Sequence, residues 1–294
     1  MHITEQKNDL NKLVSSVMVQ ADFALTADDI AFVLELAISA GASAVAMRAL
    51  ATVEEKTSPT DLVTSADKAL SELLLAALGK RFASDLVLSE EAPWVAHDHG
   101  RRRWIIDPID GTKYYVDGSG KYAVMIGLEN QSRELFGCFF MPAHNKALLG
   151  GPGLGAYLYE VNDGVAVLNK VSVSSAMPAG TVRLMVSQND LNAHGWLKEV
   201  PDVEIVIASS IGIDVFELLN DEADLFVHVR PTLGYWDTAA PCAVAQGLAF
   251  EVGTEVEDFI SYGYQSSKHE PTIVIGKAGA LAWWRRVWQN QNKK

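Results

Sequence analysis

One apolar segment of the chain ends in two aspartates separated by a proline, and this pattern restricts the possible folds more than any other. It reads Trp104-Ile105-Ile106-Asp107-Pro108-Ile109-Asp110-Gly111-Thr112-Lys113. The apolar residues have the character of a short buried strand, and the proline ends it. The glycine and threonine that follow are predicted to begin a helix, whose first N–H groups have no acceptor within the helix and suit a phosphate. The segment therefore predicts a strand–turn–helix unit that brings both carboxylates into one pocket beside an anion site.

Carboxylates lie beside an anion site when cations stand between them, and Mg²⁺ prefers hard oxygen ligands of this type. The chain has 24 Lys and Arg residues against 37 Asp and Glu residues, a net charge of −13. This acidic balance argues against a general affinity for nucleic-acid polymers. An isolated Asp-x-x-Asp-Gly would be interpreted as an acidic turn that caps a helix. Some of the acidic excess is instead a candidate for binding cations.

Two further acidic segments favour the cation site. Glu90 and Glu91 follow a predicted strand at residues 86–88, and Asp237 begins an apolar helix in Trp236-Asp237-Thr238-Ala239-Ala240. Asp237 by itself would be interpreted as a helix cap. Acids at three strand–helix junctions together predict a two-metal site for phosphoryl transfer, with the ions about 4 Å apart.

The chain divides into two patterns of secondary structure. Up to about residue 165, two helices, one beginning at Thr26 and one after Asp67, precede a series of strands, and from about residue 170 strands and helices alternate. Predicted strands of the second part are residues 183–186, 204–208, 225–229 and 272–275, and its predicted helices are residues 211–220, 238–249 and 278–289. The pattern predicts an α+β part at 1–165 followed by an α/β part at 166–294.

These segments resemble the inositol monophosphatase superfamily, the Mg²⁺-dependent, lithium-sensitive phosphatases of small phosphorylated molecules. Its hallmark segments correspond to residues 104–112 and 236–240, its loop and helix ending in a catalytic Asp to residues 58–67, and its glutamate pair to residues 89–91. The resemblance runs from Ala31 to Ile275 in matching order. It implies an α/β fold, a layered αβαβα sandwich of the sugar-phosphatase type, and a homodimer.

The resemblance implies metal ligands at six positions: Glu90, Asp107, the backbone carbonyl of Ile109, Asp110, Asp237 and Asp67. Asp107 would bridge two Mg²⁺ ions, and Asp67 with Glu90 would hold a third, weaker one. The implied catalytic group is Asp67, Thr112 and Glu90, with Asp67 and Thr112 positioning and activating the attacking water. Gly111 and Thr112 match the phosphate cradle.

The substrate within the superfamily stays open. Lys113 follows Asp-Gly-Thr, as is typical of the 3′(2′),5′-bisphosphate nucleotidases. Arg230 stands where inositol-specific relatives have a Glu. An Arg at that position can bind a second phosphate of the substrate, or it can be a surface residue with no such role. Lys56 precedes the 58–67 loop as a basic residue does in relatives, or is a solvated lysine. The nucleotidases usually show Ser-Arg-Ser-His where this chain has residues 187–190, Ser-Gln-Asn-Asp, and Gly where it has Pro241.

We expect a bisphosphate nucleotidase acting on adenosine 3′,5′-bisphosphate, then an inositol-1-monophosphatase, then a fructose-1,6-bisphosphatase; the non-enzyme alternative is a phosphometabolite-binding protein. We expect no run of about 18 apolar residues that could span a membrane, and no signal peptide at the start of the chain, hence a cytoplasmic protein. Arg101–Arg103 is interpreted as a solvated loop.

Overall fold

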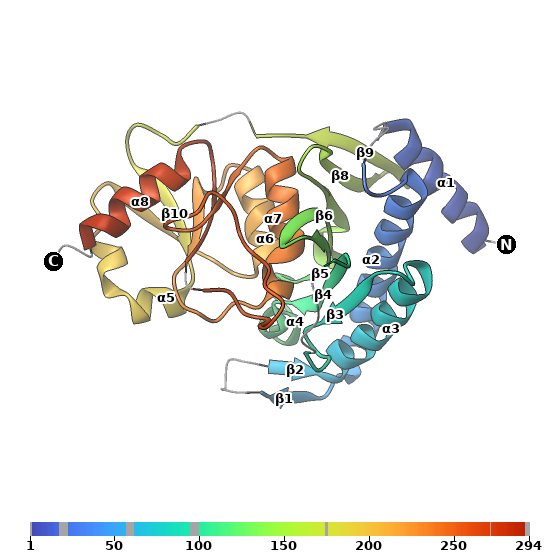
Figure 1. The fold of residues 1–294 in the computed structure, drawn as a ribbon. Helices are drawn as coiled ribbons and strands as arrows, with labels where there is room; N and C mark the ends of the chain where they lie inside the picture. The colour runs from blue at the N-terminus through green and yellow to red at the C-terminus, as the bar shows by residue number, and fades with distance from the viewer. Residues whose placement is uncertain are drawn as a thin grey trace.

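Two stacked sheets carry the fold, and helices lie outside and between them (Figure 1). The structure is a computed structural model that describes residues 2–17, 23–56, 62–94, 100–173, 176–270 and 272–291. The segment 58–61, part of a predicted catalytic loop, lies outside the described residues.

The first sheet has seven strands in the order β3-β4-β5-β6-β7-β8-β9. Its strands are β3 (Leu86–Ser89), β4 (Arg103–Asp110), β5 (Ala123–Asn130), β6 (Arg133–Met141), β7 (Lys146–Gly151), β8 (Gly155–Asn162) and β9 (Val165–Val171). Only the first pair, β3 with β4, is parallel among the described pairings of this sheet. A separate hairpin joins β1 (Val53–Glu55) to β2 (Leu62–Thr64).

The second sheet has five strands in the order β11-β10-β12-β14-β13. Its strands are β10 (Val182–Val186), β11 (Val203–Ile207), β12 (Leu225–His228), β13 (Glu251–Gly253) and β14 (Ile273–Gly276). Strand β10 runs parallel to both β11 and β12, as the alternation of strands and helices predicts.

The helices form three layers. They are α1 (His2–Val17), α2 (Ala27–Met47), α3 (Ser65–Arg81), α4 (Thr112–Asp117), α5 (Gln188–Ala193), α6 (Ile211–Leu219), α7 (Tyr235–Gly247) and α8 (Ala280–Gln291), with 3₁₀ turns at Arg48–Leu50, Pro142–His144 and Gly195–Glu199. Helices α2 and α3 cover one face of the first sheet, α6 and α7 lie between the two sheets, and α8 lies on the far side of the second sheet (Figure 1). The predicted αβαβα sandwich is confirmed.

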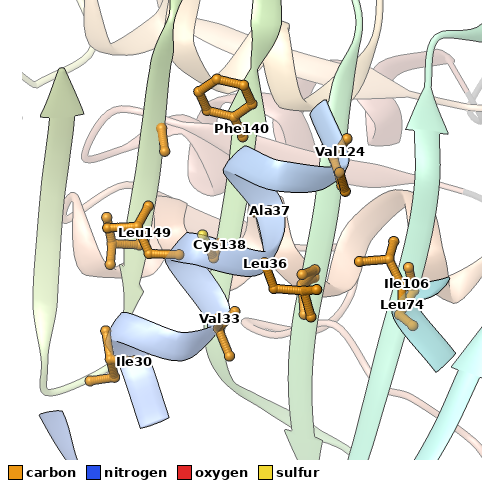
Figure 2. Close-up of a cluster of buried hydrophobic side chains, with 14 of the residues drawn as sticks. Ile30, Val33, Leu36, Ala37, Leu74, Ile106, Val124, Cys138, Phe140 and Leu149 are labelled. Carbon is orange, nitrogen blue, oxygen red and sulfur yellow. The ribbon is translucent and has the colours of Figure 1, made fainter. Parts of the chain in front are cut away.

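The core between α2 and the first sheet is built from apolar side chains one helical turn apart. Ile30, Val33 and Ala37 of α2 face strand residues such as Cys138 and Leu149 (Figure 2). Thr26 caps this helix: its hydroxyl accepts from the N–H of Asp29, whose carboxylate accepts from the Thr26 N–H in return.

The expectation about long apolar runs is wrong for α2. Residues 27–50 are long and apolar enough, by length and composition, to cross a membrane. Half of the most apolar window is buried inside the protein, and the helix begins with Asp28 and Asp29. Its apolar character is accounted for by packing on the sheet, because a helix that covers a core face is apolar without any lipid contact.

The interpretation of Arg101–Arg103 as a solvated loop is also wrong in part. Arg101 is exposed, but Arg103 has no solvent exposure and is paired with the equally buried Glu129 on the neighbouring strand β5. Arg101 precedes β4, whereas Arg103 is its first residue, and every residue of β4 is buried.

Candidate metal centre

Three carboxylates from distant parts of the chain meet at the junction of β4 and α7. Oxygen atoms of Asp107, Asp110 and Asp237 all lie within 4.8 Å of one another. Asp107 and Asp110 are 2% and 5% exposed. The structure therefore brings together three of the six positions at which the resemblance implies metal ligands.

An irregularity in β4 lets its two aspartates share one site. Residues three apart on a regular strand point to opposite faces. The pairing of β4 with β5 shifts register between Asp107 and Asp110, around Pro108, which cannot donate to the ladder. The Ile109 N–H donates to Oδ1 of Asp107 at 3.0 Å within this bend. The bend places both carboxylates in the same site.

Backbone N–H groups orient the other two carboxylates. The Gly212 N–H, in the first turn of α6, donates to Oδ2 of Asp110 at 2.8 Å. The Gly234 N–H, just before α7, donates to Oδ2 of Asp237 at 2.6 Å. An ionised carboxylate has two oxygens and about four acceptor positions, so each retains capacity for a cation.

Small residues bring α7 close enough to the sheet to place Asp237. A Cβ added at Gly137 of β6 would lie 2.1 Å from the carbonyl oxygen of Ala240, and one at Gly127 of β5 would lie 2.6 Å from the Cβ of Ala239. Only glycine permits such an approach of backbone to backbone. The Ala-Ala pair after Asp237 is thus a packing requirement of this contact.

The pair expected to position water is assembled. Thr64 caps α3, and its N–H donates to Oδ2 of Asp67 at 2.8 Å, which fixes that carboxylate in the first helical turn. The Thr112 hydroxyl lies 3.2 Å from Oδ1 of Asp67 and 3.1 Å from the Ile109 carbonyl, so it can donate to either. Burial raises the pKa of Asp67 against the opposing effect of the Thr64 hydrogen bonds.

A left-handed turn begins the helix that carries Thr112. Gly111 has φ = 86°, and a Cβ there would lie 2.8 Å from both the Lys121 carbonyl oxygen and the Ser210 Cβ. A side chain at this position would be strained in backbone conformation and in packing. Gly111 therefore allows the start of α4 to pack closely against the loop before α6, beside the carboxylates.

The carboxylates raise one another's pKa, and this supports a divalent cation among them. Burial, followed by repulsion from neighbouring carboxylates, raises the pKa of Asp107 and Asp237 well above the ordinary value. Burial raises the pKa of Asp110 to about 6 and, with a smaller opposing effect of Lys56, that of Glu90 to about 7. Oxygen donors that are buried close together and carry like charge fit Mg²⁺.

Lys56 forms ion pairs with both residues of the glutamate pair. Its ammonium is 2.7 Å from Glu90 and 2.6 Å from Glu91. Burial opposes the charged form, but the charges and hydrogen bonds of Glu90 and Glu91 together outweigh it, so that the pKa of Lys56 is raised above its ordinary value. Glu90 is thus paired with a cation of the chain itself, and the sequence offered no sign of this pairing.

A cavity of about 580 Å³ opens onto these groups. Its lining residues are Leu62, Glu90, Asp107, Ile109, Gly111, Thr112, Lys113, Tyr114, Ser187, Gln188, Asn189, Ile207, Ala208, Ser209 and Asp237. Of the predicted substrate residues, Lys113 lines the cavity with the phosphate cradle, whereas Lys56 and Arg230 are not among the lining residues. Pro241 is also absent from the lining and is buried inside α7.

Sequence reasoning missed the wall made by Ile207, Ala208 and Ser209. These residues end strand β11 and precede α6, and no acidic or glycine-rich pattern marks them. The only available signal is their place at the carboxyl end of a parallel strand, the edge where α/β proteins bind ligands.

Metal-free protein is expected to lose stability as the pH rises. The folded-state pKa values of Asp110 and Glu90, about 6 and about 7, exceed the ordinary 3.8 and 4.5, so the folded state binds more protons in this window. The free energy of unfolding then falls between about pH 4 and pH 7. Mg²⁺ binds ionised carboxylates, so the increase in Tm on its addition should grow with pH over the same window. Scanning calorimetry in EDTA and in Mg²⁺ measures both; a Tm increase independent of pH would contradict the expectation.

Comparison with known proteins places this site in a family. The sequence model of the inositol monophosphatase family matches residues 27–259. The chain is 30% identical over 219 residues to the 3′(2′),5′-bisphosphate nucleotidase CysQ of Shigella flexneri, covering 70% of this chain and 85% of that protein. It is 28% identical over 197 residues to the inositol-1-monophosphatase of Bacillus subtilis, covering 66% and 72%.

Solved structures share the fold. An IMPase of Thermotoga maritima superimposes with a TM-score of 0.71 at 21% identity, covering 90% of this chain and 99% of that one. An IMPase/NADP phosphatase complexed with Mg²⁺ and phosphate gives 0.69 at 18% identity, covering 85% and 90%. The expectation of an enzyme rather than a phosphometabolite-binding protein is confirmed. The chain belongs to the inositol monophosphatase family and is a phosphatase.

Proposed function

We propose that the protein hydrolyses a phosphate monoester of a small metabolite with the help of two to three Mg²⁺ ions. The observation that carries this proposal is the convergence of Asp107, Asp110 and Asp237 on one cavity that also holds Thr112, the hydroxyl partner of Asp67. Magnesium bound here would supply Lewis-acid activation and neutralise phosphate charge.

The residues of the chain have separate tasks in this proposal. Glu90, the Ile109 carbonyl and the three clustered aspartates hold the ions. Asp67 accepts a proton and Thr112 orients the water that gives it, because their side chains are already within hydrogen-bond reach. Gly111 and Thr112 present N–H groups to the phosphate at the start of α4, and Lys113 adds a positive charge to the same cavity wall.

A 3′(2′),5′-bisphosphate nucleotide, adenosine 3′,5′-bisphosphate in particular, is the proposed substrate. The CysQ nucleotidases that resemble this chain over most of their length support it, as does the exposed Lys113 at the cavity. Inositol 1-phosphate is the second candidate. It is favoured by the uncharged wall of Ser187, Gln188 and Asn189, whose hydroxyl and amides suit sugar hydroxyls.

Phosphate release distinguishes the candidates. The purified protein is assayed with adenosine 3′,5′-bisphosphate, inositol 1-phosphate and fructose 1,6-bisphosphate, in Mg²⁺, in EDTA and in Mg²⁺ with Li⁺. We expect turnover that requires Mg²⁺ and is highest in kcat/KM with the nucleotide. Preference for the inositol ester would support the proposed hydrolysis but refute the nucleotide as the substrate. Turnover that persists in EDTA would refute the metal mechanism.

Three further properties belong to the same proposal. Family resemblance supports inhibition by Li⁺, a homodimer and a cytoplasmic location. The Li⁺ arm of the assay tests the first, and light scattering of the purified protein tests the second. Fractionation of the source cells tests the third.

A further inference from the structure

A buried aspartate beside the cavity accepts hydrogen bonds from residues at the ends of two neighbouring strands. Asp190 in α5 has no solvent exposure. Its Oδ2 accepts from the Ser187 hydroxyl at 2.6 Å and lies 3.1 Å from Nδ1 of His228. Its Oδ1 accepts from Nε of Arg230 at 3.0 Å and from the backbone N–H groups of Arg230 and Val229 at 3.2 and 3.4 Å.

These contacts connect two structures that must keep a fixed relation for the site to work. Strands β10 and β12 are parallel neighbours, so their carboxyl ends lie at one edge of the sheet. Residues 187–189 follow β10 and line the cavity. Residues 229–234 follow β12 and lead into α7, which carries Asp237. Asp190 therefore connects the cavity wall at residues 187–189 to the segment before Asp237 by hydrogen bonds.

The ionised form of Asp190 is stabilised for this task. Burial opposes ionisation, but hydrogen bonds from His228 and Ser187 and the positive charge of Arg230 outweigh it, so the pKa of Asp190 lies below its ordinary range. Such a charge-assisted network holds its members more rigidly than neutral hydrogen bonds do.

We propose that Asp190 is a positioning residue that sets the Ser187–Asn189 wall against the metal centre, and that Arg230 supports substrate binding through Asp190 rather than by touching the substrate. The proposal rests on the phosphatase function proposed above. The sequence position of Arg230 suggested a direct contact with a substrate phosphate. The present proposal differs because the Nε of Arg230 donates to Asp190 and Arg230 does not line the cavity.

The same sheet provides a matched control. Asp224, 2% exposed, accepts from Arg183 and from Lys277, with Nζ of Lys277 at 2.6 Å. It precedes β12, at the end of the strand away from the cavity. Asp224→Asn therefore removes a comparable buried charge next to the amino end of β12 without touching the wall.

The test compares Asp190→Asn and Arg230→Ala with Asp224→Asn in the full chain. The side chain of Arg230 is 26% exposed, so we expect Arg230→Ala to fold even if Asp190→Asn does not. We expect both wall variants to raise KM for adenosine 3′,5′-bisphosphate and for adenosine 3′-monophosphate by a similar factor, about 10-fold or more. Their kcat and the inhibition constant of inorganic phosphate, which occupies only the phosphate subsite, should stay near wild type. Asp224→Asn should lower Tm without changing either KM.

Two outcomes would overturn the proposal. Arg230→Ala could raise KM for the bisphosphate but not for the monophosphate, while Asp190→Asn leaves both KM values unchanged. That result would show that Arg230 contacts a substrate phosphate directly. Equal KM changes in Asp190→Asn and Asp224→Asn would reduce Asp190 to a general stability role. A wild-type protein without Mg²⁺-dependent turnover refutes the proposed function instead, and the wall is then judged from calorimetric dissociation constants for adenosine 3′,5′-bisphosphate in the same variants.

Discussion

Asp107→Asn is expected to lower kcat by about 100-fold to 1000-fold, because one metal-directed charge is worth several kcal/mol in the transition state. Asp107 lies in the carboxylate cluster, and after burial the charges of Glu90, Asp110, Asp237 and Asp67 each raise its pKa. Asparagine keeps the shape and can still accept from the Ile109 N–H, but it removes the charge that would bridge two ions. Steady-state kinetics over a range of Mg²⁺ concentrations measure the loss.

Stability separates this effect from unfolding. Removal of one charge from a cluster of buried like charges relieves repulsion, so metal-free Asp107→Asn is expected to be at least as stable as the wild type at pH 7. Asp117→Asn is the matched control, since Asp117 is exposed at the end of α4 and should leave kcat unchanged. Turnover near the wild-type level in Asp107→Asn would remove Asp107 from the catalytic centre.

Glu129→Gln is expected to reduce the free energy of unfolding by about 3–5 kcal/mol, because it leaves a buried guanidinium without its counter-charge. Arg103 and Glu129 both have no solvent exposure. Arg103 also donates to the carbonyls of Tyr262 and Gly263, each at 2.8 Å, and lies 4.3 Å from the centre of the Tyr264 ring. The pair thus joins β4 and β5 to the segment that follows β13.

Urea unfolding provides the measurement, and a surface pair provides the control. Glu54 pairs with Lys68 at 2.7 Å, but their side chains are 62% and 49% exposed. Glu54→Gln should change the free energy of unfolding by no more than about 1 kcal/mol, since solvent screens such pairs. A loss in Glu129→Gln as small as that in Glu54→Gln would show that Arg103 finds other compensation.

Local patterns predicted the elements of this fold well because each depends on neighbouring residues. Thr26 and Asp29 cap α2 through a spacing of three residues, and Thr64 and Asp67 cap α3 in the same way. Residues 104–106 formed a buried strand, and residues 236–240 formed the first turns of a helix. The strand pattern missed Arg103, whose burial depends on a partner on another strand and on the segment at 262–264.

The sequence by itself determined which residues stand at the strand–helix junctions, and with them the acids that the site uses. Local spacing indicated Glu90, Asp107, Asp110 and Asp237, because caps, bends and strand ends are decided within a few residues. Asp67 was implied by the family resemblance. Only the tertiary structure decided which of those groups meet. It closed Asp237 onto Asp107 and Asp110 through glycines that admit α7, and it paired Arg230 with Asp190. Such contacts join residues far apart in the chain, and their geometry follows from how the layers pack rather than from any local pattern.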